Sequence, residues 1–133
     1  MTQSLAFVFP GQGSQAVGML SELADRYAVV RTTFEEASQI LGYDLWQLVQ
    51  EGPAETLNQT DKTQPAILTA SVALWRVWQE LEGPRPSVVS GHSLGEYSAL
   101  VCAGAISFAD AVRLVKLRGE FMQEAVPEGV GAM

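Results

Sequence analysis

One segment, Ser87–Ser98, constrains the fold of this chain more than any other. A short β-branched run ends in Gly91-His92-Ser93-Leu94-Gly95, and a helical pattern over 97–103 follows at once. This order of strand, Gly-x-Ser-x-Gly and helix is the context of a nucleophile elbow, whose glycines leave room for a sharp turn. The sequence therefore predicts that Ser93 is exposed at a strand-to-helix bend, beside the free N–H groups of a helix N-terminus. The alternative is a glycine-rich turn whose serine only caps the helix.

The rest of the chain alternates one further apolar run with helical patterns. The run Leu5–Phe9 precedes Pro10 and is typical of a strand buried on both faces. Helices are expected over 18–27, 29–41, 44–51 behind an Asp44 cap, about 65–82, and 108–124 behind a Ser107 cap. Strands separated by helices predict an α/β fold, a parallel sheet flanked by helices. Two strands are few for a stable sheet, so the sequence looks cut short.

The long helix is expected to begin at Pro65, with Thr63 or Gln64 outside it and the proline in the first turn. Helical spacing predicts one buried side, made of Ile67, Leu68, Ser71, Leu74, Trp75 and Trp78.

Composition narrows the class of protein. The 133 residues are 47% hydrophobic and 17% charged, which is typical of one globular domain. A formal net charge of -7 argues against a general nucleic-acid binder. The single cysteine, Cys102, excludes an internal disulfide and is expected in the core, and no run approaches membrane-spanning length. We expect a soluble, cytoplasmic protein with no nucleic-acid or membrane partner.

A glycine loop, Gly11–Ala16, follows the first strand. A serine nucleophile needs N–H donors for the oxyanion, and the backbone N–H groups of Leu94 and Gln12 are suitably placed to supply two. The loop could equally be a plain tight turn. It also fits the Ala-ended dinucleotide fingerprint, which would need a second strand about 20 residues on, where the pattern is helical.

Arg118 has apolar neighbours at helical spacing, namely Leu114, Val115, Phe121 and Met122. An arginine in an apolar stripe is costly unless it meets an anion. The residues leave three alternatives open: a fork for a substrate carboxylate, pairing with a core carboxylate, or snorkelling to the helix edge.

The chain offers no separate histidine to act as the base for Ser93. His92 is the only histidine, and neighbours at a sharp turn do not point their side chains at one another. An orienting or packing role for His92 is therefore expected, and the base would lie outside this sequence or be absent.

Three sequence blocks resemble those of malonyl-CoA:acyl carrier protein transacylases and related acyltransferase domains of fatty-acid and polyketide synthases. The blocks are Phe9–Gln15, Thr63–Ala66 and Gly91–Glu96, and Tyr97–Gly104 and Arg118-Gly119 strengthen the likeness. The resemblance runs from about Ser4 to Met133.

The resemblance implies a role for each motif. Ser93 carries the malonyl group as an ester, the N–H groups of Gln12 and Leu94 form the oxyanion hole, and Arg118 holds the malonyl carboxylate. Gln64 lines the same pocket, and His92 stands beside the nucleophile without being its base. No metal or bound cofactor is implied; malonyl-CoA is the substrate and acyl carrier protein the partner.

The same resemblance implies an α/β-hydrolase-like acyltransferase core in which residues 1–133 form an incomplete N-terminal part. In that family a ferredoxin-like subdomain follows the last helix seen here, and the base is a later histidine. The expected function is malonyl transfer from coenzyme A to the carrier thiol in fatty acid biosynthesis.

Two alternatives stay open: a serine esterase or thioesterase, and an inactive fragment. For carrier docking, the nearest basic residues are Lys62, Arg76, Arg113 and Lys116.

Overall fold

Two parallel strands and seven helices make up residues 4–127 and 129–131, the part of the chain that the computed structural model describes. The elements are β1 (Ala6–Phe9), α1 (Ser21–Arg26), α2 (Ala28–Leu41), α3 (Leu45–Glu51), α4 (Ala54–Leu57), α5 (Thr60–Glu80), β2 (Val88–Gly91), α6 (Leu94–Cys102) and α7 (Phe108–Ala125). The expected α/β class with a parallel sheet and flanking helices is confirmed.

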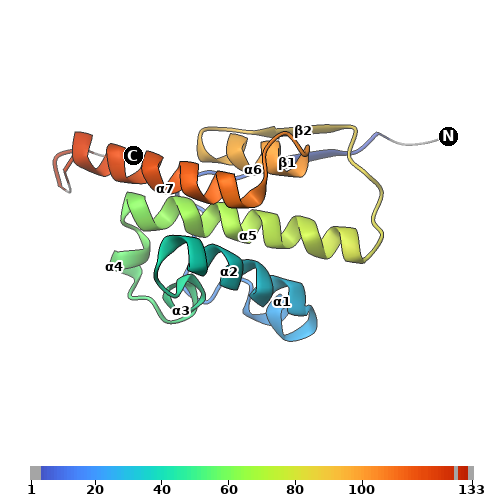
Figure 1. Cartoon of the computed structure of the whole chain (residues 1–133), viewed down its shortest axis with the longest axis horizontal. Helices are drawn as coiled ribbons and strands as arrows, with labels where there is room; N and C mark the ends of the chain where they lie inside the picture. Colours follow the sequence, from blue (N-terminus) through green and yellow to red (C-terminus); the bar gives the residue numbers. More distant parts are fainter. Residues whose placement is uncertain (1–3, 128, 132–133) are drawn as a thin grey trace.

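The sheet brings together two segments that lie about eighty positions apart in the chain. β1 pairs with β2 in parallel, with Ala6 opposite Val88 and Phe9 opposite Gly91. Figure 1 shows the strands and α6 in one layer, α5 and α7 across the middle, and α1 to α4 on the other side of α5. Because the strands are parallel, their carboxyl ends meet at one edge, where the glycine loop and the elbow both begin.

The prediction that the first strand is buried on both faces is wrong for this chain. β1 alternates between exposed and half-buried residues, and Val8 is 79% exposed. Phe7, on the other face, packs edge-on against Trp75 and Trp78 of α5, with ring centroids 5.6 and 5.3 Å apart. The described helices thus cover only one face of the two-stranded sheet, and an apolar run alone does not say how many faces are covered.

α5 is the central element of the core. Every residue from Thr63 to Ala73 is buried. The helix lies between α2 on one side and α6 and α7 on the other, so it has no solvent-facing side over these three turns. The expectation of a single buried side was too narrow, because small residues such as Ala66 and Ala70 let neighbouring helices approach all round.

The expected start of this helix is also wrong. α5 begins at Thr60, so Pro65 lies in its second turn, where its ring nitrogen cannot donate to a preceding carbonyl. The side chain of Thr63, inside the helix, donates to the carbonyl oxygens of Leu57 and Gln59. Leu74, expected on the buried side, is 43% exposed.

The helix caps follow the sequence closely. Asp44 Oδ1 accepts from the N–H of Gln47 at 3.0 Å, and Ser107 Oγ accepts from the N–H of Asp110 at 3.1 Å. Gly42 ends α2 in the left-handed conformation at φ 84°. The short helix α4 was not expected from the sequence. Over the described residues, no helix has the length and apolar character needed to cross a membrane.

Candidate active site

The elbow around Ser93 has the geometry that the motif requires. Ser93 is exposed at φ 56° and ψ -117°, a strained conformation for a residue with a side chain, and it directly precedes α6. A Cβ on Gly91 would lie 2.1 Å from the carbonyl oxygen of Gly95. A Cβ on Gly95 would lie 2.2 Å from the carbonyl oxygen of Phe9. Both glycines are therefore needed for the strand, the turn and the helix to pack this closely.

Arg118 joins two residues that, according to the resemblance, line one pocket. Its Nη2 donates to Ser93 Oγ at 3.0 Å, and its Nη1 donates to Gln64 Oε1 at 2.8 Å. Gln64 is fully buried in α5, and its Nε2 donates to Met122 Sδ at 3.2 Å. Two helices, α5 and α7, thus contribute to one hydrogen-bonded chain that ends at the elbow serine.

The guanidinium of Arg118 lies within ion-pair distance of no carboxylate in the described part of the chain. It is half-buried, and its Cζ lies 5.6 Å from the centre of the Tyr97 ring. The ion pairs found there involve Lys62, Arg76, Arg113 and Lys116, and not this residue. Pairing with a core carboxylate, one of the three alternatives for Arg118, is therefore not observed.

The apolar stripe predicted around Arg118 is only partly buried. Val115 is inaccessible to solvent, but Leu114 is 46% and Phe121 63% exposed. The spacing placed these side chains on neighbouring positions of α7 correctly. Periodicity cannot say which of them a neighbouring element covers.

The glycine loop lies against the elbow. A Cβ on Gly11 would lie 3.1 Å from the carbonyl oxygen of His92 and 4.0 Å from the backbone nitrogen of Leu94. The N–H of Gln12, the next residue, donates to no acceptor in the described part of the chain. The glycine loop is therefore in contact with the elbow, next to the N-terminus of α6.

The structure gives His92 no side-chain hydrogen bond to another described residue. The residue is exposed, and its carbonyl oxygen accepts from the N–H of Gly95 at 3.0 Å. Among the described residues, the one side chain hydrogen-bonded to Ser93 Oγ is Arg118. The orienting or packing role of His92 stays a prediction.

Two contacts of the site were missed from the sequence. Met122 receives the amide of Gln64, and Tyr97 stacks under Arg118. Helical spacing places Met122 beside Arg118, since it follows Arg118 by four positions on α7. It gives no sign of Tyr97, which lies on a different helix, α6. The side-chain amide of Gln12 donates to Thr60 Oγ1 at 3.1 Å, and no local sequence pattern predicts this contact.

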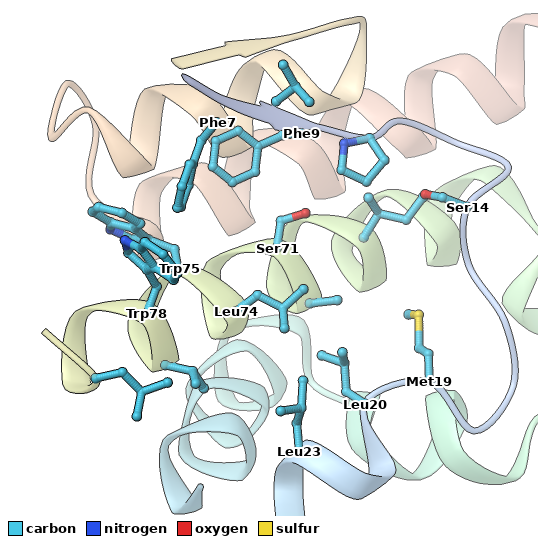
Figure 2. Close-up of a pocket in the computed structure, with 16 residues that line it drawn as sticks. Phe7, Phe9, Ser14, Met19, Leu20, Leu23, Ser71, Leu74, Trp75 and Trp78 are labelled. Atoms are coloured by element: carbon cyan, nitrogen blue, oxygen red, sulfur yellow. The ribbon is translucent and has the colours of Figure 1, made fainter. Parts of the chain in front are cut away.

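Two cavities in the described part of the chain border the glycine loop. An apolar cavity of about 560 Å³ lies between Phe7 and Phe9 of β1, Trp75 and Trp78 of α5, and the segment that precedes α1 (Figure 2). A second cavity, of about 670 Å³, is lined in part by Gln12, Thr60, Met122 and Gln123. The second one adjoins the chain of hydrogen bonds that leads to Ser93, and Ser93 lines neither.

Other functional classes receive no support from the residues described. The dinucleotide alternative needs a strand where α2 stands. Within the described ranges, no three His, Cys, Asp or Glu side chains are grouped as metal ligands.

The four basic residues considered for carrier docking each lie within 4.0 Å of a carboxylate oxygen.

A parallel α/β layer with an exposed serine at a Gly-x-Ser-x-Gly elbow between a strand and a helix is the arrangement of the α/β-hydrolase type of fold. Comparison with known proteins gives the family: residues 6–133 match the acyl transferase domain, and the chain belongs to that family.

The most similar relatives share one name. The malonyl CoA-acyl carrier protein transacylase of Salmonella typhimurium is 71% identical over all 133 residues, which cover 43% of that protein. Its counterpart in Bacillus subtilis strain 168 is 53% identical over 129 residues, covering 97% of this chain and 40% of the relative.

Solved structures agree with this assignment. An acyl carrier protein S-malonyltransferase from Vibrio cholerae superposes with a TM-score of 0.92 at 68% identity, over 96% of this chain and 42% of that one. A malonyl-transacylase in complex with a type II polyketide synthase acyl-carrier protein superposes with a TM-score of 0.93 at 67% identity, over 96% and 41%. The chain thus spans about two-fifths of the length of the relatives it matches.

Proposed function

We propose that this chain carries the acyl-binding part of a malonyl-CoA:acyl carrier protein transacylase. The observation that carries the proposal is Arg118, which is half-buried, touches both Ser93 Oγ and Gln64 Oε1, and has no carboxylate partner among the described residues. A malonyl group brings the carboxylate that this guanidinium lacks, and the guanidinium lies directly beside the serine that would carry the acyl group.

The proposed reaction is a double displacement at Ser93. The serine oxygen attacks the thioester carbon of malonyl-CoA, the carbon–sulfur bond breaks, and coenzyme A leaves as a thiol with the serine's proton. The thiol of the carrier protein's phosphopantetheine then attacks the ester, and the proton returns to Ser93. The N–H groups of Gln12 and Leu94 stabilise the oxyanion of both tetrahedral intermediates.

The same proposal covers the partners and the setting. The relatives are named for malonyl-CoA and acyl carrier protein, and one of them has been solved with its carrier protein. We infer the same substrate and partner here, a role in fatty acid biosynthesis, and a cytoplasmic location. The chemistry needs no metal or other cofactor, and the net charge of -7 does not favour a nucleic-acid partner.

Binding of acyl-CoA thioesters to variants of Arg118 tests the proposal. In a Ser93→Ala background, which prevents acylation, malonyl-CoA should bind at least about tenfold more tightly than acetyl-CoA, because a charge-assisted pair is worth that much. Arg118→Ala should abolish the preference. Titration calorimetry measures both affinities.

Arg113→Ala is the matched control. Arg113 lies on the same helix, is exposed and pairs with Asp110 at 3.1 Å, so its loss should leave the preference intact. Equal preference in the Arg118→Ala and Arg113→Ala proteins would overturn the role of Arg118. Steady release of free malonate without carrier protein would favour the esterase alternative.

A further inference from the structure

The glycine loop is held on the start of α5 by two glutamine side chains. Gln12 Nε2 donates to Thr60 Oγ1 at 3.1 Å, and Gln15 Nε2 donates to Asn58 Oδ1 at 2.8 Å. Gln15 Oε1 at the same time accepts from the N–H of Gly13 at 2.8 Å. The backbone of the loop is therefore fixed from outside, by residues some 45 positions further along the chain.

Thr60 takes part in a second contact, with α7. Its backbone N–H donates to Gln123 Oε1 at 3.2 Å. This N–H is the first of α5, and the preceding residue, Gln59, provides no side-chain cap. Gln123, a residue of α7, thus caps the N-terminus of α5, and this hydrogen bond links the two helices.

The two helices also touch directly at this level. A Cβ on Gly119 would lie 2.8 Å from Asp61 Cα and 3.1 Å from the carbonyl oxygen of Thr60. Gly119 follows Arg118, and Thr60 precedes Gln64 by one helical turn. The close contact and the hydrogen bonds therefore fix the parts of α5 and α7 that carry the two side chains of the acyl site.

We propose that Thr60 and Gln123 are positioning residues. They hold the glycine loop, which contains Gln12, in a fixed position relative to Gln64 and Arg118. The idea rests on the proposed function, since it assigns the loop's N–H groups to the oxyanion hole. Thr60 touches neither Ser93 nor Arg118 through a hydrogen bond; it acts through Gln12, and Gln123 acts through Thr60. A misplaced oxyanion donor slows the chemical step more than it weakens binding of the thioester.

Thr60→Val tests this proposal, because it replaces the accepting oxygen with a methyl group of similar size and keeps the backbone N–H. The maximal rate of Ser93 acylation by malonyl-CoA should fall about tenfold, less than the loss of a whole oxyanion donor. The half-saturating malonyl-CoA concentration should change less than about twofold. Thr60→Ser, which retains an oxygen acceptor, should restore the rate.

Hydrogen exchange measures the positioning without any reaction. Gly13 and Ser14 donate to acceptors within the loop, and their amides should exchange about fivefold faster in Thr60→Val than in Thr60→Ser. Unchanged exchange in Thr60→Val would overturn the proposal, whether or not the parent chain acylates. Absence of acylation in the parent chain would count against the proposed function instead.

A second pair of variants guards against misfolding of Thr60→Val. Gln123→Met removes the oxygen that caps α5, whereas Gln123→Glu keeps one, so the first should loosen the loop and the second should not. The control is Gln47→Met, which removes an exposed amide bonded to Glu51 on α3, away from the site. Equal exchange rates in Gln123→Met and Gln47→Met would contradict the role of Gln123.

Discussion

At the scale of single residues, Arg118 sets the chemistry that the site can accept. Its guanidinium is partly withdrawn from water, and the groups around it are neutral: the Ser93 hydroxyl, the Gln64 amide and the Tyr97 ring. A charge in this position favours an anionic ligand over a neutral one, because the ligand supplies the missing countercharge. Under the proposed function, a dicarboxylic acyl group should therefore fit the site better than an acetyl group.

Tyr43 is a second residue whose surroundings have a measurable consequence. Its hydroxyl is buried and has no hydrogen-bond partner in the described part of the chain. Burial raises the pKa of Tyr43 well above its ordinary value, and the nearby carboxylates of Asp61 and Glu120 raise it further. The folded protein therefore keeps this proton at a pH at which the unfolded chain has released it.

Tyr43→Phe should accordingly make the protein less sensitive to alkali. Above about pH 10, the ordinary value for tyrosine, the parent loses stability as pH rises because only the unfolded state ionises. The variant lacks this loss, and near neutral pH it should be more stable by up to about 1 kcal/mol, because no hydroxyl is left unpaired. Urea unfolding across this pH range measures the difference. Parallel stability curves for the two proteins would contradict the assigned cause.

Which site residues the sequence could predict depended on how local their signals are. The Gly-x-Ser-x-Gly pattern located Ser93 and Leu94, because the turn itself demands the two glycines. Helical spacing singled out Arg118, the resemblance added Gln64, and the structure brings both together near the serine. Thr60 and Gln123 escaped notice, because their contacts join segments about 48 and 63 positions apart without any local pattern.

At the scale of elements, the junction of β2 with α6 depends on backbone contact. The Gly91 and Gly95 backbones lie so close that no side-chain atom fits between them, and Gly95 also meets the carbonyl oxygen of Phe9. The elbow thus packs β2, α6 and the end of β1 in one place. The strain at Ser93 is sustained by this packing.

Gly91→Ala should destabilise the fold by about 3 kcal/mol, since the new methyl overlaps the Gly95 carbonyl and backbone must move. Ser90→Ala, one position earlier in β2 and exposed, should change the free energy of unfolding by less than about 0.5 kcal/mol. Denaturant unfolding of the two variants gives the comparison. Equal stabilities would mean that the elbow relaxes freely.

Helix boundaries were predictable where a cap is local and not where it comes from elsewhere. Asp44 and Ser107 cap their own helices, and both starts were correct. The start of α5 was placed too late, because Pro65 normally marks a first turn, whereas here Gln123 of α7 caps the helix at Thr60. A contact with another helix therefore determines where α5 begins, which the local sequence pattern could not show.

At the scale of the whole molecule, the core surrounds α5 and the site lies at the carboxyl edge of the sheet. Alternation of strands and helices was enough to predict the parallel sheet. It could not predict that one sheet face is exposed, as Val8 shows, because coverage depends on what packs there. The chain matches about two-fifths of each relative's length.

Removal of the Ser93 proton during catalysis depends on the groups that the whole molecule places beside the serine. No imidazole in the described part of the chain is hydrogen-bonded to the serine. An oxyanion hole and a binding site without a general base still retain part of an enzyme's rate acceleration. Acylation of this chain should therefore be slow but specific.

Intact mass spectrometry of the 133-residue chain after incubation with malonyl-CoA tests this account most directly. We predict that the mass of one malonyl group is added slowly to the parent chain and that Ser93→Ala gains none. An unmodified parent chain after long incubation, or an equal mass gain in Ser93→Ala, would contradict the claim that Ser93 is the acylated residue.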